Sequence, residues 1–297
     1  MQHAKCYVKD YPRPQFMRAE WQSLNGEWKF GFGEDTEEEK ALRGELPRKI
    51  VVPFTYETLL SGIGDRTPHE TVWYARTIEK REEVRNILNI DGADYRAAVY
   101  VNGRKVGSHE GAYSRFSLDI TDSLREGANL LVIRCDDGLS PVQVRGKQRW
   151  AVRNHGCHYV QMTGLWKSVW LEYTDSTYLK NVRITPFPSD GEVELIFEVS
   201  RPAADVFVDY AIEFRGRQVC AGSVCADGTE QKLRVRVASD QAIEQVSASY
   251  LGWPCIYDLQ FRVRKGNKVA DTVGSYFALT DFSVRGGQFS HCSAPKY

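Results

Sequence analysis

The sequence predicts an all-β protein built from two β-sandwiches. Three observations carry this prediction: apolar and polar residues alternate along most of the chain, turn sequences separate the runs, and helical periodicity is nearly absent. With 297 residues, the chain is long enough for two domains that each bury a core. We expect the first domain over residues 1–178, the second over 179–278, and a tail over 279–297.

The alternation is clearest in the second domain. Runs with one apolar and one polar face predict half-buried strands near 193–199, 206–214, 233–237 and 257–263. The sequences RGR at 215–217 and KGNK at 265–268 predict hairpin turns between such runs. Short strands at this spacing are typical of an immunoglobulin-like β-sandwich.

The first domain is also rich in predicted strands, but its connections are longer. The candidate strands lie near 26–31, 49–52, 72–80, 86–92, 95–101, 104–108, 115–120, 129–135 and 167–174. Long return loops favour a jelly-roll β-sandwich over a simple meander. Residues 35–44 form the single predicted helix, with an acidic first turn and Gly44 at its end. Asn102 and Gly103 supply the two positive-φ residues of a type I′ hairpin turn, so we expect a structural role for Asn102.

The charge of the chain bears on its binding partners, and its cysteine content bears on its cellular compartment. Lys plus Arg equals Asp plus Glu, 39 each, which gives no overall attraction to nucleic acid or to an anionic membrane. No apolar stretch is long enough to span a membrane, and the N-terminus lacks the apolar core of a signal peptide. The seven scattered cysteines then predict free thiols in the cytoplasm, although Cys220 and Cys225 are close enough in sequence to pair.

Motifs for phosphate, cofactor or metal chemistry are missing or incomplete. The sequence contains no Walker loop, no dinucleotide fingerprint and no G-x-S-x-G elbow. His155, Cys157 and His158 are residue types that bind zinc, but a structural zinc site needs a second ligand pair, and none is visible. We therefore expect no cofactor and no metal.

Several segments together resemble glycoside hydrolase family 2, the group of β-galactosidases, β-glucuronidases and β-mannosidases. In the family's order they include YPRPQF (11–16), SLNGEWKF (23–30), VVPFTYETLLSGIG (51–64), HEGAYSRFSLDIT (109–121), TGLWKSVWLE (163–172) and IYDLQF (256–261). The resemblance implies a jelly-roll sugar-binding domain, an immunoglobulin-like domain and then a (β/α)₈ barrel. In the family, two glutamates of that barrel catalyse retaining hydrolysis.

The end of the sequence leaves no room for this barrel. Only 18 residues follow Leu279, whereas a barrel needs roughly 250. The family places its acid/base in an Asn-Glu pair, and this dipeptide does not occur in the sequence. We therefore expect no catalytic residue in this chain and no hydrolysis by the chain alone.

The candidate carbohydrate contacts lie in a long loop over residues 136–166. In the resembling enzymes, this side of the jelly roll leans over the barrel mouth and contributes to the sugar site. The resemblance therefore points to Arg145, Lys147 and Gln148 as hydrogen-bond donors, to Trp150 as an apolar face for a sugar ring, and to His158 and Tyr159. The alternative is structural: Lys147 and Gln148 stabilise the loop, and Trp150 fills the core.

Three functions stay open at this stage. The first is the non-catalytic front portion of a family 2 glycosidase with weak carbohydrate binding. The second is a fragment or subunit that completes an active site with a separate barrel, docking through apolar tail residues such as Phe282, Phe289 and Tyr297. The third is a structural remnant without a ligand, which packs as a homo-oligomer. Neither nucleic acid nor membrane is an expected partner.

Overall fold

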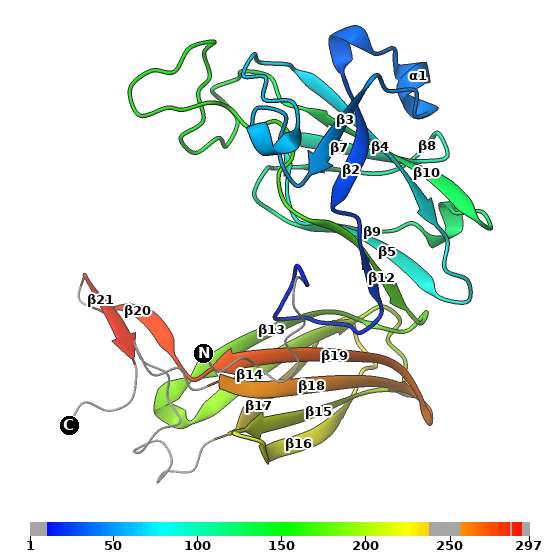
Figure 1. Cartoon of the computed structure of the whole chain (residues 1–297). Coiled ribbons are helices and arrows are strands. Elements are labelled where there is room, and N and C mark those ends of the chain that lie inside the picture. Colours follow the sequence, from blue (N-terminus) through cyan, green and yellow to red (C-terminus); the bar gives the residue numbers. More distant parts are fainter. Residues whose placement is uncertain (1–10, 238–255, 286, 293–297) are drawn as a thin grey trace. The chain divides into compact units, whose positions relative to one another are not determined.

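The computed structural model describes residues 11–237, 256–285 and 287–292. The chain divides into two compact units (Figure 1): a first unit, Glu20–Tyr173, and a second unit, which combines Met1–Ala19 with Thr174–Tyr297. Both units consist almost entirely of antiparallel strands, which confirms the prediction of an all-β protein with β-sandwiches. The expected domain limits themselves stay a prediction.

The first unit contains two main sheets. The six-stranded sheet has the order β3 (Arg48–Val52), β2 (Gly26–Phe32), β4 (Thr71–Glu79), β10 (Ala128–Asp136), β7 (Arg96–Val101) and β8 (Arg104–Glu110). The four-stranded sheet has the order β1 (Trp21–Ser23), β12 (Val169–Thr174), β5 (Arg85–Ile90) and β9 (Phe116–Asp119). Two short strands, β6 (Ala93–Asp94) and β11 (Gly164–Leu165), pair with each other beside them. Nine of these strands coincide with predicted ones, and β1, β6 and β11 were not predicted.

The core of the first unit is aromatic at its centre. Tyr74 packs edge-to-face against Trp28 and Phe30, with ring centroids 6.5 Å and 5.2 Å away. All three rings are buried in one cluster with the apolar faces of both sheets. Such edge-to-face pairs add about 0.5–1.5 kcal/mol each beyond the area they bury. This rigid core supports the loops at the ends of its strands.

The hairpin between β7 and β8 follows the sequence prediction. Asn102 and Gly103 have φ values of 50° and 79°, as a type I′ turn requires. The Asn102 side chain accepts a hydrogen bond from the Leu130 backbone N–H at 3.0 Å and donates one to Asn129 Oδ1 at 2.8 Å. Asn102 therefore has the structural role that was expected.

Helices are short and few in the described ranges. The predicted helix over 35–44 is reduced to α1 (Glu38–Leu42), because Thr36 is extended and separates it from the 3-10 turn η1 (Gly33–Asp35). The other turns of this kind are η2 (Leu59–Ser61), η3 (Thr121–Ser123) and η4 (Pro188–Asp190). Within the described residues, no helix has the length and apolar character needed to cross a membrane.

The second unit contains a three-stranded and a four-stranded sheet. Their orders are β13 (Leu179–Phe187), β14 (Glu192–Val199), β17 (Gln231–Arg236), and β16 (Arg217–Cys225), β15 (Val206–Phe214), β18 (Ile256–Lys265), β19 (Lys268–Ala278). Phe197 and Phe261 meet in the shared core with ring centroids 6.1 Å apart. The four predicted runs correspond to β14, β15, β17 and β18.

The tail forms a further pair of strands that was not predicted. β20 (Asp281–Arg285) pairs antiparallel with β21 (Gln288–Cys292). The side chains of Phe282 and Phe289 are not described, and Tyr297 lies outside the described residues. The proposed apolar docking face of the tail therefore stays a prediction.

The described residues before Glu20, 11–19, belong to the second unit. Met17 and Gly274 of β19 exchange two backbone hydrogen bonds, each 2.8 Å long, so the segment extends the sheet edge. Phe16 is buried in the core of the second unit. Arg18 forms a buried ion pair with Asp271, whose Oδ2 also accepts a hydrogen bond from the Leu179 N–H. Residues from both ends of the chain thus build one sandwich.

Candidate functional site

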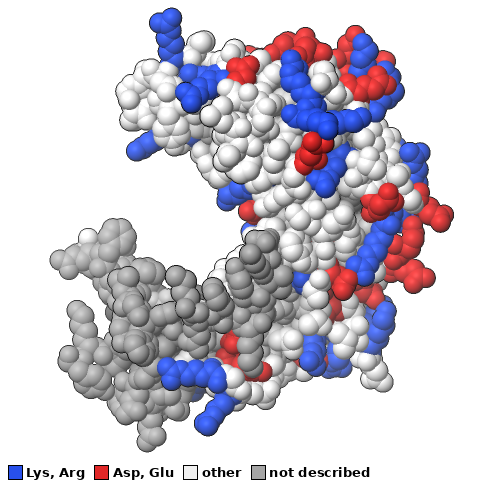
Figure 2. All heavy atoms as spheres, in the orientation of Figure 1, with Lys and Arg blue, Asp and Glu red and all other residues white. Residues whose placement is uncertain are grey.

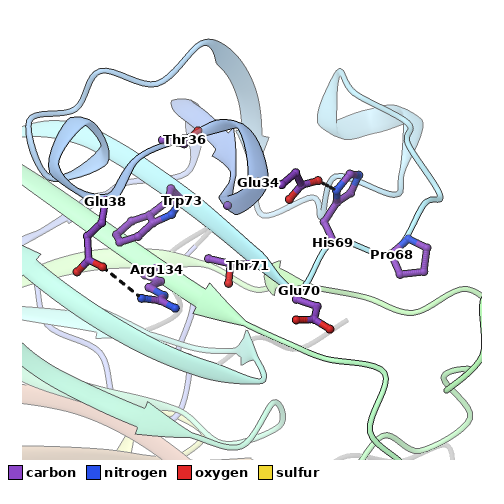
Figure 3. A pocket seen from close by; sticks show the side chains of 10 residues that line it. Glu34, Thr36, Glu38, Pro68, His69, Glu70, Thr71, Trp73 and Arg134 are labelled. Atoms are coloured by element: carbon purple, nitrogen blue, oxygen red, sulfur yellow. Dashed lines mark hydrogen bonds and ion pairs between the residues drawn. The ribbon is translucent and has the colours of Figure 1, made fainter.

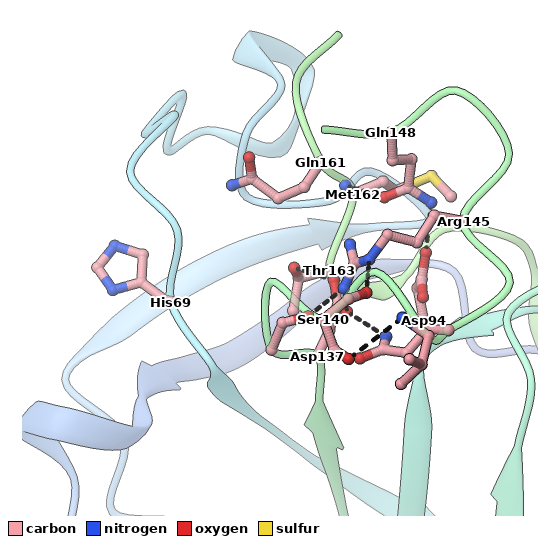
Figure 4. A network of polar contacts seen from close by, with 12 residues as sticks. His69, Asp94, Asp137, Ser140, Arg145, Gln148, Gln161, Met162 and Thr163 are labelled. Atoms are coloured by element: carbon pink, nitrogen blue, oxygen red, sulfur yellow. Dashed lines mark hydrogen bonds and ion pairs between the residues drawn. The ribbon is translucent and has the colours of Figure 1, made fainter. Parts of the chain in front are cut away.

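The candidate site is the loop over residues 137–163, which connects β10 to β11 (Figure 4) and is called the long loop below. Its composition is unusual, because no acidic residue occurs between positions 138 and 162. The same stretch contains four basic residues, Arg145, Lys147, Arg149 and Arg153. The loop is therefore a positively charged segment in a chain without net charge.

The long loop has two arms, an outgoing arm that follows β10 and a returning arm that leads to β11. Gln148 of the outgoing arm binds Met162 of the returning arm near the strands, which we call the base of the loop. Its side-chain Nε2 donates to Asp94 Oδ2 at 2.7 Å and to the Tyr113 hydroxyl at 3.2 Å. Its Oε1 accepts the backbone N–H of Met162 at 2.7 Å. Gln148 is only 4% exposed, so its amide is used for contacts within the protein.

Arg145 and Asp137 form a second connection at the base. Their ion pair measures 2.7 Å, and neither side chain is more than 5% exposed. Asp137 also accepts a hydrogen bond from the Thr163 hydroxyl at 3.0 Å, and the Arg145 Nε donates to the Ser140 carbonyl at 2.8 Å. In Figure 4 these side chains converge beneath the loop. The Arg145 guanidinium is thus turned inward.

Glu57 holds the returning arm of the loop from the neighbouring segment. Its Oε1 accepts the Thr163 backbone N–H at 3.0 Å, whereas its Oε2 is buried without a hydrogen-bond partner in the described structure. A buried carboxylate with one unsatisfied oxygen is costly in its charged form. Burial raises the pKa of Glu57 to about 7.

Asp94 is a second buried carboxyl with a perturbed pKa. Burial, and next the negative charge of Asp137, raise its pKa to about 7. The hydrogen bond from Gln148 and the charge of Arg145 act in the opposite direction but are smaller effects. Two carboxyls at the base of the loop therefore titrate near neutral pH, Asp94 beneath the outgoing arm and Glu57 beneath the returning arm.

The outer part of the loop is exposed and aromatic. Backbone hydrogen bonds from Arg149 N–H to the Tyr159 carbonyl (2.8 Å) and from Tyr159 N–H to the Lys147 carbonyl (3.0 Å) bring the two arms together. Beyond this neck, the Trp150 ring packs against His155 and His158, with centroids 4.8 Å and 4.3 Å away. We call Lys147, Trp150, Arg153, His155, His158 and Tyr159 the outer face of the loop.

The structure separates the six residues that the sequence singled out. Arg145 and Gln148 lie in the base and bond to protein groups. Lys147, Trp150 and Tyr159 lie on the outer face and are exposed, with Trp150 at 42% and Tyr159 at 56%. His158 is half-buried, and its Nδ1 has no hydrogen-bond partner in the described structure. Contact of any of them with a sugar stays a prediction.

Sequence reasoning missed the carboxyls that hold this loop. Asp94 lies in an ordinary DGADY turn sequence, and Glu57 follows a strand like many exposed glutamates. Asp137 was one of two consecutive aspartates with no distinguishing neighbour. The absence of acidic residues from 138–162, opposite four basic ones, was the one signal that could have marked the loop as distinct.

A separate hollow of about 560 Å³ lies beside η1, α1 and the start of β4 (Figure 3). Its charged side chains are largely paired with one another. Arg134 bonds Asp136 at 2.8 Å and lies 3.7 Å from Glu38, while the His69 ring stacks on Phe32 with centroids 3.7 Å apart. None of the six candidate residues lines it.

Charge is mixed over the face of the molecule in Figure 2. Acidic side chains gather at the end of the first unit that carries α1, whereas the end formed by the long loop is mostly uncharged with basic side chains. Among the described residues, no group of three His, Cys, Asp or Glu side chains could hold a metal ion. His155, Cys157 and His158 therefore form no such group.

Comparison with known proteins gives a consistent assignment. The family model described as "Glycosyl hydrolases family 2, sugar binding domain" matches residues 21–175. A β-galactosidase of Thermoanaerobacter pseudethanolicus is 29% identical over 115 residues, which cover 37% of this chain and 14% of that protein. A β-glucuronidase of Paenibacillus borealis is 26% identical over 250 residues, covering 76% of this chain and 41% of the relative.

Solved structures agree in fold. The Bifidobacterium dentium β-glucuronidase complexed with coumarin-3-O-glucuronide superposes with a TM-score of 0.72 at 20% sequence identity. This match covers 97% of the present chain and 51% of the B. dentium chain. The chain thus spans about half, or less, of the length of these relatives.

Proposed function

Because the chain belongs to glycosyl hydrolase family 2, we propose that it forms the sugar-side portion of a β-glycoside-hydrolysing protein and binds carbohydrate weakly through the outer face of the long loop. The observation that carries this proposal is the division of the loop into a buried base and an exposed aromatic face. A side chain as large as Trp150 that is exposed on an anchored loop offers a flat apolar surface to the C–H face of a sugar.

The charge of the loop favours an acidic sugar. Lys147 and Arg153 are exposed on the outer face, and no carboxylate lies between positions 138 and 162 to neutralise them. A uronate carboxylate is well suited to bind such cations through charge-assisted hydrogen bonds. Relatives with the name β-glucuronidase support the same substrate class. We therefore propose β-glucuronides ahead of neutral β-galactosides.

Hydrolysis itself requires groups outside the described residues. Residues 11–237 and 256–292, apart from position 286, form strands and short turns and contain no (β/α)₈ barrel. A retaining glycosidase needs two carboxyl groups about 5–5.5 Å apart on a rigid scaffold. We propose that a barrel, in the same or another polypeptide, supplies them and that the outer face lies against the bound sugar.

Two finer assignments accompany this proposal. The three-plus-four strand order of the second unit supports an immunoglobulin-like sandwich, which acts as a spacer. Cys135, Cys157, Cys220 and Cys225 are free thiols. Free thiols support a reducing compartment, so the cytoplasm stays our proposed location.

The test is a calorimetric or NMR titration of the purified chain with methyl β-D-glucuronide and methyl β-D-galactoside. With only one wall of a pocket present, we expect millimolar affinity, about −4 kcal/mol, and tighter binding of the glucuronide. Trp150→Ala should abolish the response, and Trp150→Phe should retain most of it because the ring face remains. Lys147→Ala should weaken the glucuronide more than the galactoside.

The matched control is Val269→Ala, which removes an exposed apolar side chain of the second unit, 49% exposed. It should leave binding unchanged. Saturable binding of neither sugar, or equal binding by the Trp150→Ala variant, would contradict the proposed carbohydrate site.

A further inference from the structure

We propose that the guanidinium of Arg149, at the neck of the long loop, binds a carboxylate and thereby makes the site select acidic sugars. That the ligand is a sugar rests on the proposed function. The carboxylate site itself follows from a buried charge of this chain and is testable without any sugar.

Arg149 is a buried cation without a matching carboxylate. Among the described residues, three arginines are at most 6% exposed, namely Arg18, Arg145 and Arg149. Arg18 pairs with Asp271 at 2.9 Å. Arg145 pairs with Asp137 at 2.7 Å. Arg149 forms no ion pair with any residue in the described ranges, and its partners are hydrogen-bond acceptors only. Because a buried charge is costly unless it is paired, an anion at Arg149 would be stabilising.

The acceptors around this guanidinium are all neutral. Its Nε donates to Gln161 Oε1 at 2.7 Å, and its Nη1 donates to Asn154 Oδ1 at 3.2 Å. Its Nη2 donates to the Arg66 carbonyl oxygen. These oxygens satisfy three of the five N–H groups of an arginine but leave its charge unmatched. One N–H remains on each terminal nitrogen, and a carboxylate accepts such a pair of donors in bidentate contact.

The neighbouring loop residues add no negative charge. Lys147 and Arg153 are exposed cations on either side of Arg149, and no Asp or Glu occurs between positions 138 and 162. The end of the first unit that the long loop forms accordingly shows basic side chains (Figure 2). These charges attract an anion toward the neck.

Asn154 is the group that an incoming carboxylate would displace. Its side chain is exposed, and its contact with Arg149 is the longest of the three. A charged carboxylate oxygen accepts a stronger hydrogen bond from a guanidinium than a neutral amide oxygen does. The exchange therefore forms a charge-assisted pair and returns the Asn154 amide to water.

The aromatic outer face begins directly beside this position. Trp150 follows Arg149 in the chain, and its ring packs on His155 with centroids 4.8 Å apart. Arg149 itself binds Asn154, the residue before His155. A uronate that lays its C–H face on Trp150 thus has a guanidinium nearby for its carboxylate. A neutral sugar would use the same ring but leave the buried charge unmatched, so Arg149 determines specificity.

The first test uses sodium acetate as the carboxylate probe. The ¹⁵N-labelled intact chain is titrated at pH 6, with acetate replacing chloride at constant ionic strength. We expect saturable shifts of the Arg149 Nε–H and of the Asn154 side-chain amide, while the Nε–H of the paired Arg145 stays in place. Absence of a saturable shift at Arg149 would overturn the proposal. Because no sugar is present, this failure is distinct from a failure to bind carbohydrate.

Asn154→Asp is the sharpest variant, because it keeps the size of the side chain and gives Arg149 a carboxylate of its own. It should raise the melting temperature and abolish the acetate response. A folded Asn154→Asp variant that retains the acetate response would overturn the proposal.

The selectivity is measured with methyl β-D-glucuronide and methyl β-D-glucoside, which differ only at C6. The unmodified chain should bind the glucuronide about tenfold more tightly, as expected for hydrogen bonds between charged groups. Arg149→Gln and Asn154→Asp should each remove this difference. Arg104→Gln is the matched control, because Arg104 is an exposed arginine of β8 outside the loop, and it should leave the difference intact.

Equal affinity of the unmodified chain for the two sugars would overturn the role of Arg149 and leave the proposed carbohydrate binding intact. Acetate shifts at Arg149 without binding of either sugar would support the carboxylate site and contradict only the proposed function.

Discussion

Two buried aspartates, Asp271 in the second unit and Asp94 in the first, differ in the charge that faces them. The Arg18 guanidinium donates to both oxygens of Asp271, from Nε to Oδ1 at 3.0 Å and from Nη2 to Oδ2 at 2.9 Å, and the Leu179 N–H donates to Oδ2 as well. Asp94 receives one amide hydrogen bond and faces a second carboxylate, Asp137. Burial is thus matched by a counter-charge at Asp271, whereas at Asp94 burial and a neighbouring negative charge raise the pKa.

The Arg18–Asp271 clamp also explains how residues 16–18 join the second unit. Arg18 lies between Met17, which pairs with β19, and the first unit, which begins at Glu20. The pair thus fixes a segment that also bonds β19 through Met17 and through the Gln15 carbonyl. A matched charge suits this purpose, because neither buried charge is left without its counter-charge.

The largest expected effect comes from breaking the matched pair. Arg18→Leu leaves the Asp271 carboxylate buried without its counter-charge and should lower the free energy of unfolding by about 3–5 kcal/mol. Urea unfolding of the intact chain, followed by circular dichroism, measures this loss. Replacing both residues with leucine should recover most of it, because no buried charge remains. A loss below about 1 kcal/mol for Arg18→Leu would show that the pair is not a clamp.

Asp94 has no matched counter-charge, so we expect its contribution to the free energy of unfolding to depend on pH. Burial and Asp137 raise the Asp94 pKa to about 7, above its ordinary value, so its contribution to stability is largest in acid and is lost as pH rises to 7. Between pH 5 and pH 8, the ionisation of this one group should lower the free energy of unfolding by about 2.6 kcal/mol. Asp94→Asn should flatten this slope in denaturant titrations repeated across the range. An identical slope in the variant would assign the pH dependence to other groups.

The outer face of the loop should matter little for folding. Trp150 is 42% exposed and contacts two histidine rings, so Trp150→Ala should change the free energy of unfolding by less than about 0.5 kcal/mol. Thermal unfolding measures this change. A loss of several kcal/mol would instead favour the alternative from the sequence, in which Trp150 fills the core.

The smallest effect is expected where an ion pair is exposed. Lys232 and Glu194 pair at 2.7 Å across β17 and β14, and the lysine side chain is 66% exposed. Lys232→Ala should cost less than about 1 kcal/mol, and high salt should remove the difference because it screens exposed charges. A cost similar to that of Arg18→Leu would contradict the view that burial determines the value of a matched pair.

Local sequence patterns predicted most of the strands. The alternation over 206–214 predicted the bounds of β15. Asn102-Gly103 predicted the hairpin turn between β7 and β8. Both predictions were possible because strand faces and positive-φ turns depend on residues that are neighbours in the sequence. Short strands such as β6 and β11 were missed. Each has only two residues, and its existence depends on a partner about 70 residues away in the chain.

For the candidate site, the sequence could name residues but could not assign their roles. The sequence identified the long loop and six of its residues through a family resemblance. It could not distinguish the inward Arg145 and Gln148 from the outward Trp150 and Tyr159, because that difference depends on Asp137 and Asp94. The contact of Arg18 with Asp271 is equally non-local, since 253 positions separate the two residues.

The most direct test of the account is a chemical-shift map of the ¹⁵N-labelled chain, titrated with methyl β-D-glucuronide at pH 6. We expect the shifts to concentrate at Lys147, Trp150 and Tyr159, including the Trp150 indole N–H. Amides of the loop base and of the second unit should stay in place. Shifts confined to the second unit or to the hollow beside α1, or no shifts at sugar concentrations well above the millimolar range, would contradict it.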